Sequence, residues 1–447
     1  MPRPTAGSAR PPAQTSKLAQ TYRRFAQVDA PKISPLYERI ALALSESPEA
    51  LHAIETAPTR KQTPLLILAA LHHLALTNQS PPLTTAYQAA ATSAAAASVA
   101  VTSVAVTSAA AATSDEPATT APPPAAASDK ALASPTAAGP DKASPAAGSG
   151  EAAPTAVVAA GSDTTASRGV PEHMDLAVEA AVRAVVEMKD AVVAVVGQRK
   201  VRANVLGNHA VLYPAIAEVA RRAGIGAVGL IDVGCAAGFN LNVDRAGINY
   251  DNAQSLGDPS SPVQAAASVV GERAVPTNAL PEVVVRIGID LEPIDTRDPD
   301  EAGWLRACVP PDQPDRMARL EGELELAASA PPFLMRGDKV ELLPDAIAQV
   351  PADALPVVTT TWALSDLPLE SRLRCMQRLD AAATNRPVAW VSVEGVGVAP
   401  AIPTFGDRPA SGHSIIGLAL FDHSTLHTEA VGRCWLRGQM LAWLADS

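Results

Sequence analysis

The sequence predicts an α/β protein with a doubly wound, mostly parallel, Rossmann-like sheet that follows a helical N-terminal region. Two observations predict this fold. From residue 225 onward, short apolar runs rich in β-branched residues alternate with amphipathic helical segments. One of these runs, ending at Val233, stops at a glycine turn, as a buried strand that enters a helix does. Ligands of such sheets lie beyond the carboxyl ends of the strands, so we expect the functional site there.

Composition excludes several classes of function. The 447-residue chain carries a formal net charge of -11 and shows no basic stripe, which argues against a nucleic-acid surface. Its four cysteines lie far apart without a C-x-x-C pair, so neither a metal site nor a disulfide framework is indicated. The first residues lack the apolar core of a signal peptide, and the run Gln79 to Ser114 is too weakly apolar for a membrane span. We expect a cytoplasmic protein with reduced thiols.

Composition also divides the chain into five parts. Residues 1–16 have the composition of a disordered leader, and residues 17–87 have helical periodicity. Residues 88–168 are rich in Ala, Ser, Thr and Pro, and a stretch with so few large apolar side chains cannot offset its ordering entropy, so we expect a low-complexity insert without structure. Residues 169–224 are predicted to be helices that pack on the sheet domain, which occupies residues 225–447.

Three details of the helical parts are predicted. Ser45 or Ser47 is expected to cap the helix that contains Pro48, and one long amphipathic helix is expected from Met174 to Lys200. His72 and His73 lie on a nearly all-apolar helix and point about 100° apart, so we interpret them as histidines at the edge of a core rather than as a metal pair.

The motif with most chemical content is GLIDVGCAAGFNL, residues 229–241. Asp232 precedes Gly234 by two residues, and three residues separate Gly234 from Gly238, which is not the G-x-G-x-x-G pattern of nicotinamide cofactors. No Gly-Lys-Ser/Thr follows, so a Walker loop is excluded as well. The arrangement resembles the first motif of class I S-adenosylmethionine-dependent methyltransferases. In that case a helix begins after Gly238 and its free amides face a ligand; the alternative is an ordinary turn from a strand to a helix.

Carboxylates recur at the predicted rim of the sheet. Asp290 ends the strand that begins at Val283, Asp338 follows Gly337, and Asp366 and Glu394 fall near the ends of two later strands. Together with Asp232 they are expected to converge on one side of the sheet. Some acids of this kind cap helices instead.

Longer runs of the chain resemble one family. SPLYERIALAL, LLILAALHHLAL, RKVRANVLG, LIDVGCAAGFNLNVDR, GDPSSPV, RIGIDLEPIDTRDPDEAGWLRA, LMRGDKVELLP and RPVAWVSVEG are similar, in this order, to members of the domain-of-unknown-function 2332 family. The resemblance covers almost everything except the leader and Gln88 to Arg168. It implies an actinobacterial type of protein with a methyltransferase-like fold. Where members usually have Thr-Asn-Glu, this chain has Ala203, Asn204 and Val205.

The methyltransferase pattern implies a cofactor site for S-adenosylmethionine. Asp232, Gly234 and Gly238 would surround the amino acid part of the cofactor, Asp290 would accept hydrogen bonds from both ribose hydroxyls, and Asp338 would bind the adenine amino group. Asp290 lies much farther from Asp232 than the about 20 residues of a simple strand-helix-strand unit, so Asp244 to Pro281 must form an insertion. This leaves Asp244 or Asp251 as the alternative ribose acid.

The segment TTTWALSDLP is the candidate for the catalytic side of the site. Trp362 offers a flat apolar surface, and Ser365 and Asp366 offer two polar groups that can orient an acceptor. The alternative is that Ser365 or Asp366 caps the helix that begins near Pro368. The leading functional hypothesis is methyl transfer to a small molecule, with Trp362 and Asp366 as catalytic residues and no metal.

The sequence gives less support to two other functions, nucleophilic hydrolysis and metal-dependent hydrolysis through histidines. Nucleophilic hydrolysis lacks a G-x-S-x-G elbow, and the histidines near the C-terminus lack an H-E-x-x-H signature. The alternative to an enzyme is a binding or regulatory protein that retains the methyltransferase-like fold.

Overall fold

The structure is a computed structural model that describes residues 16–112, 169–202, 206–423 and 425–445. It divides into two compact units, one made of Met1–Ala95 with His173–Ser447 and the other of Ala96–Glu172. The expected disordered leader except Ser16, most of the expected low-complexity insert, and the departure at Ala203 to Val205 lie outside the described residues. None of the helices in the described ranges has the length and hydropathy that a membrane span needs.

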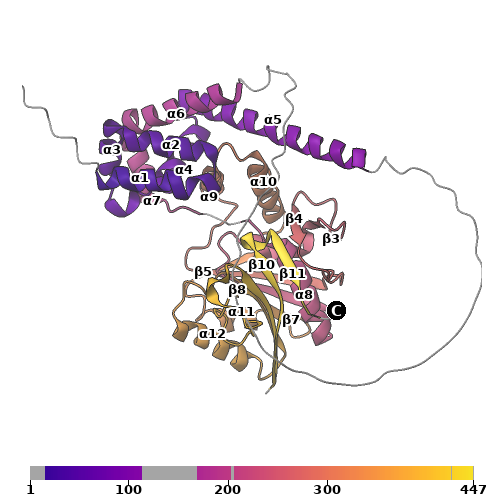
Figure 1. Ribbon diagram of the computed structural model, residues 1–447. Helices are drawn as coiled ribbons and strands as arrows, with labels where there is room; N and C mark the ends of the chain where they lie inside the picture. The colour runs from indigo at the N-terminus through magenta and orange to yellow at the C-terminus, as the bar shows by residue number, and fades with distance from the viewer. Residues whose placement is uncertain (1–15, 113–168, 203–205, 424, 446–447) are drawn as a thin grey trace, which may run out of the picture. The chain divides into compact units, whose positions relative to one another are not determined.

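The N-terminal region is helical, as expected (Figure 1). Serines supply the N-caps of its first three α-helices, because Ser16, Ser34 and Ser47 each accept a hydrogen bond from a backbone N–H three residues later. Of the two caps proposed from sequence, Ser47 is the one that acts. The helices of this region are α1 (Lys17–Val28), α2 (Pro35–Glu46), α3 (Pro48–Glu55), α4 (Pro64–Leu76), α5 (Pro81–Ala112), α6 (Gly169–Glu187) and α7 (Lys189–Gln198), with short 3-10 helices η1 (Ala30–Lys32) and η2 (Thr59–Lys61).

Two boundaries differ from those expected. The long helix predicted from Met174 to Lys200 is two helices, because Met188 leaves the helical region of backbone space (φ -113, ψ 26) between α6 and α7. Helix α5 continues to Ala112, beyond the expected boundary at Gln88, since Ala favours helix even where few large side chains are available for packing. The absence of structure expected further along this insert stays a prediction.

Of the two histidines of α4, His73 lies at the edge of the helical core, as interpreted, whereas His72 lies inside it. His72 is buried and its Nδ1 lies 3.3 Å from the carbonyl oxygen of Ala307, while His73 is half-buried against Trp304. Trp304 and Ala307 belong to helix α9 (Pro299–Ala307), which therefore packs on α4 as part of the helical core.

The rest of the described chain is a mixed α/β domain around one large, mostly parallel sheet. Its eleven described strands have the order β3-β2-β4-β11-β10-β9-β8-β7-β1-β5-β6. The strands are β1 (Ala227–Val233), β2 (Gly247–Tyr250), β3 (Ser255–Gly257), β4 (Gln264–Val269), β5 (Glu282–Asp290), β6 (Phe333–Arg336), β7 (Leu355–Thr361), β8 (Val388–Gly395), β9 (Ser414–Asp422), β10 (Thr425–Trp435) and β11 (Met440–Trp443).

Helices cover both faces of this sheet (Figure 1). Helix α8 (His209–Ala223) packs on one face, against Leu230, Val357 and Val391, and ends at Gly224, which has the left-handed conformation common at helix C-termini. Helices α11 (Leu343–Ala348) and α12 (Leu369–Ala382) pack on the other face. The remaining described helices are α10 (Pro314–Ser329), η3 (Phe239–Arg245), η4 (Pro409–Ser411) and η5 (Leu436–Gly438).

The structure corrects one expectation about the sheet and adds detail to another. No long helix follows Gly238: the chain forms only the 3-10 helix η3, with a kink at Asn242, so the expected row of free helix amides is absent there. The predicted insertion between Asp244 and Pro281 holds strands β2, β3 and β4, which extend the sheet beyond the expected α/β unit.

Candidate functional site

A glycine turn follows β1 at the carboxyl end of the sheet. Gly234 and Gly238 both adopt positive φ, +78° and +74°. Side chains rarely tolerate this conformation, and a Cβ on Gly234 would also lie 3.0 Å from the Cβ of Ala363. The two glycines singled out from sequence are therefore required by the backbone. We call residues 234–238 the glycine turn.

Asp290 at the end of β5 holds this turn. Its Oδ2 accepts a hydrogen bond of 3.1 Å from the backbone N–H of Ala236, inside the turn, and its Oδ1 accepts one of 2.9 Å from that of Glu292. Strand β1 pairs with β5 in parallel, which places both strand ends at the same edge. The acid and the turn, predicted separately from sequence, are thus joined directly.

Asp232 lies beneath the turn and is only 1% exposed. Thr359 Oγ1 donates to its Oδ1 at 2.8 Å, and Asn240 Nδ2 donates to its Oδ2 at 3.2 Å. Burial raises the pKa of Asp232 to about 7; the two hydrogen bonds favour the ionised form but do not outweigh burial, and the negative charge of Asp290 raises the pKa further. Asp232 is therefore built into the protein interior between β1 and β7.

Asp338 and its neighbour Lys339 lie beyond β6. The exposed Asp338 accepts hydrogen bonds at Oδ1 from the backbone N–H groups of Val340 and Glu341, at 2.9 and 3.0 Å, so it caps its own turn. Lys339 Nζ donates to the carbonyl oxygen of Ala363 at 2.5 Å and lies 3.7 Å from the position of a Cβ on Gly234. Lys339 thus connects the segment after β6 to the segment after β7 beside the glycine turn.

Trp362 and Asp366 differ in their contacts. Trp362 has positive φ (54°), donates from Nε1 to Ser414 Oγ at 2.8 Å and stacks under the guanidinium of Arg437, whose Cζ is 5.4 Å from the ring centroid. Asp366 is exposed. The N-cap of α12 is Pro368 without a side-chain hydrogen bond, so the capping alternative for Ser365 and Asp366 is wrong.

Glu394 at the end of β8 binds the segment that follows β7 and includes Ser365. It is buried, accepts the backbone N–H of Leu364 at 3.0 Å, and accepts the hydroxyl of Ser365 at 3.2 Å. Burial raises the pKa of Glu394 to about 6, although both hydrogen bonds act in the opposite direction.

The two alternative ribose acids have other partners. Asp244 forms an ion pair with Arg286, with an Oδ2 to Nη2 distance of 2.5 Å, and Asp251 accepts the backbone N–H of Val269 in β4 at 2.9 Å. Among the three candidates, Asp290 is the acid whose carboxylate bonds to the glycine turn.

Sequence reasoning missed a second feature, a concave site of about 580 Å³ that Trp362 also lines. We call it the basic pocket, because its lining includes four cations, Lys32, Arg316, Arg319 and Arg437. They come from η1, α10 and η5, so no local pattern could have revealed them. Beside them lie Asn208 and His209 at the start of α8.

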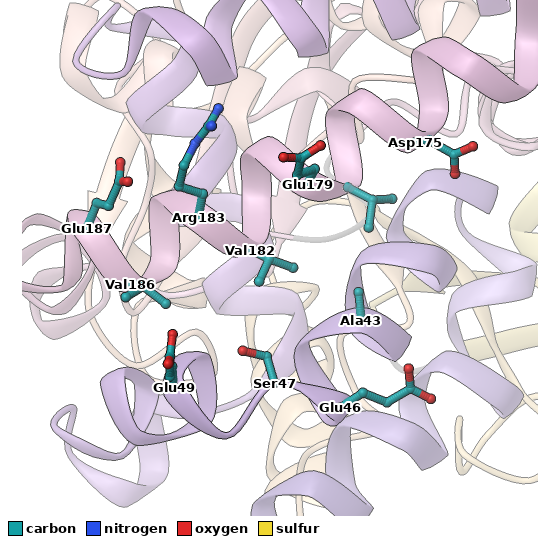
Figure 2. Close-up of a pocket in the computed structure, with 11 residues that line it drawn as sticks. Ala43, Glu46, Ser47, Glu49, Asp175, Glu179, Val182, Arg183, Val186 and Glu187 are labelled. Atoms are coloured by element: carbon teal, nitrogen blue, oxygen red, sulfur yellow. The ribbon is translucent and has the colours of Figure 1, made fainter.

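A third concave region of about 600 Å³ lies in the helical part, where α6 faces α2 and α3 (Figure 2). Its labelled side chains are mainly acidic, with Arg183 as the cation among Glu46, Glu49, Asp175, Glu179 and Glu187. Throughout the described part of the chain there is no group of three or more His, Cys, Asp or Glu side chains placed to hold a metal ion. This region has no connection with the rim of the sheet.

The described domain is thus a mixed α/β protein with carboxylates and a glycine turn at the carboxyl ends of its parallel strands. Comparison with protein families places it more narrowly. The model of DUF2332, an uncharacterized protein conserved in bacteria, matches residues 19–121 and 110–443. The chain belongs to this family, in agreement with the resemblance found from the sequence. No match was found among curated proteins or among solved structures.

Proposed function

We propose that the protein is an S-adenosylmethionine-dependent methyltransferase that acts on a small molecule. The observation that carries the proposal is the hydrogen bond from Ala236 in the glycine turn to the Asp290 carboxylate, which assembles the two most distinctive sequence features at one strand edge. When bound, the cofactor would supply an electrophilic methyl group. Transfer of that group needs an acceptor held in line more than it needs a catalytic side chain.

The strand order supports this proposal. In chain order, β1, β5, β6, β7 and β8 occupy positions 3-2-1-4-5, the order with which doubly wound dinucleotide-binding sheets begin. The order in which strands are added to the sheet reverses between β1 and β7, and ligands of such sheets bind at this reversal. The glycine turn follows β1 and Trp362 follows β7, so both lie at the reversal.

The residues also fit the cofactor chemically. An ionised carboxylate offers about four acceptor positions. Asp290 accepts one backbone N–H at each oxygen, which leaves acceptor capacity for two ribose hydroxyls. In this proposal Gly234 and Gly238 let the backbone approach the cofactor, Asp338 binds the adenine amino group through its second oxygen, and Trp362 and Asp366 face the acceptor.

One observation favours the alternative of a non-catalytic binding protein. Asp232 has both oxygens bonded to internal side chains, and Lys339 and Ala363 pack beside Gly234. These contacts fill part of the space next to the turn with protein. A bound cofactor whose methyl group is enclosed by protein on every side would decide for this alternative.

Calorimetric titration with S-adenosylhomocysteine tests the proposal. We expect binding by the natural protein and a loss of about 1–3 kcal/mol in Asp290→Ala, the scale of hydrogen bonds to a charged group. Asp251→Ala is the matched control, since Asp251 also accepts a backbone N–H, that of Val269, but follows β2 rather than β5. Thermal melting of each variant must show a folded protein. No binding by the natural protein, or equal affinity in both variants, would refute the assignment.

A further inference from the structure

The basic pocket has an excess of positive charge that the described protein does not balance. Lys32, Arg316, Arg319 and Arg437 line it, and none of them forms an ion pair with a carboxylate in the described ranges. Asp315 is the acidic side chain among the lining residues. In a protein with a net charge of -11, four cations without a paired carboxylate around one cavity indicate a place for an anion.

A contact between the segment before α10 and the start of α2 brings two of these cations, Lys32 and Arg316, to the same pocket. The buried Asp312, just before α10, accepts the Ser34 hydroxyl at 2.6 Å and the backbone N–H of Leu36 at 3.0 Å. This contact fixes the start of α2, and with it the nearby Lys32, beside Arg316. Burial lowers the pKa of Arg316, and the positive charge of Arg319 lowers it further.

Backbone dipoles add to the field of the side chains. Helix α8 begins at the pocket with Asn208 as its N-cap, and helix α10 begins there with Gln313. Neither N-cap side chain bonds to a helix amide, so the first-turn N–H groups stay without a side-chain cap. The positive ends of two helices of 15 and 16 residues therefore meet at the site of the four cations.

A flat surface forms one wall of the same pocket. Arg437 stacks on Trp362, and both residues hold a left-handed backbone conformation, with φ of 53° and 54°. Such conformations are strained in non-glycine residues and are concentrated at ligand sites. The pocket volume of about 580 Å³ is within the range of small-molecule sites.

The pocket also connects to the glycine turn. The backbone N–H of Asn208 donates to Asn240 Oδ1 at 2.9 Å, and Asn240 Nδ2 donates in turn to the Asp232 carboxylate. Asn208 lines the pocket and Asp232 lies beneath the turn. The side chain of Asn240 thus links the basic pocket to the residues beneath the glycine turn.

We propose that the basic pocket binds a small metabolite through a phosphate or carboxylate group, with the Trp362 ring against the body of that molecule. Arg316 and Arg437 hold the anionic group from α10 and η5. The further assignment of this metabolite as the methyl acceptor rests on the proposed function, because it depends on a cofactor at the glycine turn. Binding of the anion itself does not depend on the proposed function.

Calorimetric titration without any cofactor tests the site. The probes are inorganic pyrophosphate and citrate, which present phosphate and carboxylate groups separately, at low ionic strength. We expect at least one probe to bind, with affinity about tenfold lower in Arg316→Gln and in Arg437→Gln, the effect of one lost charge-assisted hydrogen bond. Arg24→Gln, on the exposed face of α1, is the matched control and should bind as the natural protein does.

The outcomes separate this proposal from the previous one. Pyrophosphate binding alone assigns a phosphate ligand, and citrate binding alone assigns a carboxylate ligand. Absence of binding by both probes, or an equal loss in Arg24→Gln, overturns the proposal. If the anions bind with the expected arginine dependence but S-adenosylhomocysteine does not bind, the pocket assignment stands and methyl transfer fails.

Discussion

The glycine turn and the basic pocket differ in how their charges are balanced. At the turn, the carboxylates of Asp232 and Asp290 accept hydrogen bonds from the protein itself. In the pocket, Arg316, Arg319 and Arg437 face a cavity without a described ionic partner. Hydrogen bonds from the protein satisfy the two carboxylates of the turn, although burial still disfavours the ionised form of Asp232, whereas the cations that face the cavity are left for a ligand at some cost in stability. Three predictions follow from this difference.

The largest effect is expected from Asp232, through pH. Its folded-state pKa of about 7 lies above the unfolded value of about 3.9, so the folded protein holds this proton more tightly. Its contribution to stability is therefore complete below about pH 4 and is lost as the pH rises through about 7, by roughly 2–4 kcal/mol. The contribution of Glu394 to stability is likewise lost as the pH rises through about 6, because burial raises its pKa to about that value.

Urea unfolding of Asp232→Asn at several pH values checks this prediction. The variant cannot ionise at this position, so its free energy of unfolding should rise relative to that of the natural protein as the pH increases from 4 to 7. Parallel curves for the two proteins would show that Asp232 titrates normally.

An intermediate effect is expected at Gly234. A Cβ at this position requires a positive φ of 78° in a residue that disfavours it and would contact Ala363 at 3.0 Å. We expect Gly234→Ala to lower the free energy of unfolding by about 1–3 kcal/mol. The matched control is Gly197→Ala in α7, where a Cβ meets no atom within 4 Å and stability should be unchanged or slightly raised. Equal effects at both glycines would contradict the role of the turn.

The smallest effect is expected from Arg319→Gln without ligand. Because Arg319 lies near Arg316 and has no described ionic partner, its loss removes repulsion and no ion pair. The free energy of unfolding should change by less than about 0.5 kcal/mol. A loss of more than about 1 kcal/mol in the free energy of unfolding, measured by thermal or urea unfolding, would mean that the pocket cations stabilise the fold. The pocket would then not differ from the glycine turn in how its charges are balanced.

Much of the sheet and of the glycine turn could be predicted because their signals are local. Strands β1 and β5 are apolar runs that end at an acid or a glycine, and Gly234 and Gly238 stand where the backbone turns. Strand β10 was not predicted, since only its second half is buried and its first residues are polar and exposed.

The basic pocket could not be predicted because its signal is not local. Lys32 becomes a neighbour of Arg316 only through the contact of Asp312 with the start of α2, a pairing between residues far apart in the chain. The expected helix after Gly238 was wrong for a related reason. There the chain turns through η3 into β2, and Asn240 bonds to Asp232 and Thr361 where the first turns of that helix would have been.

The four cysteines are free and buried, and they are distributed over different cores. Cys308 lies in the helical core, while Cys375 and Cys434 lie on opposite faces of the sheet. Burial raises the pKa of Cys308 to about 11 and that of Cys375 and Cys434 to about 12, so the native thiols are protonated and inert at neutral pH. Alkylation of each cysteine therefore occurs only when its own surroundings open. The chain thus carries natural reporters of local unfolding for the helical region and for each face of the sheet.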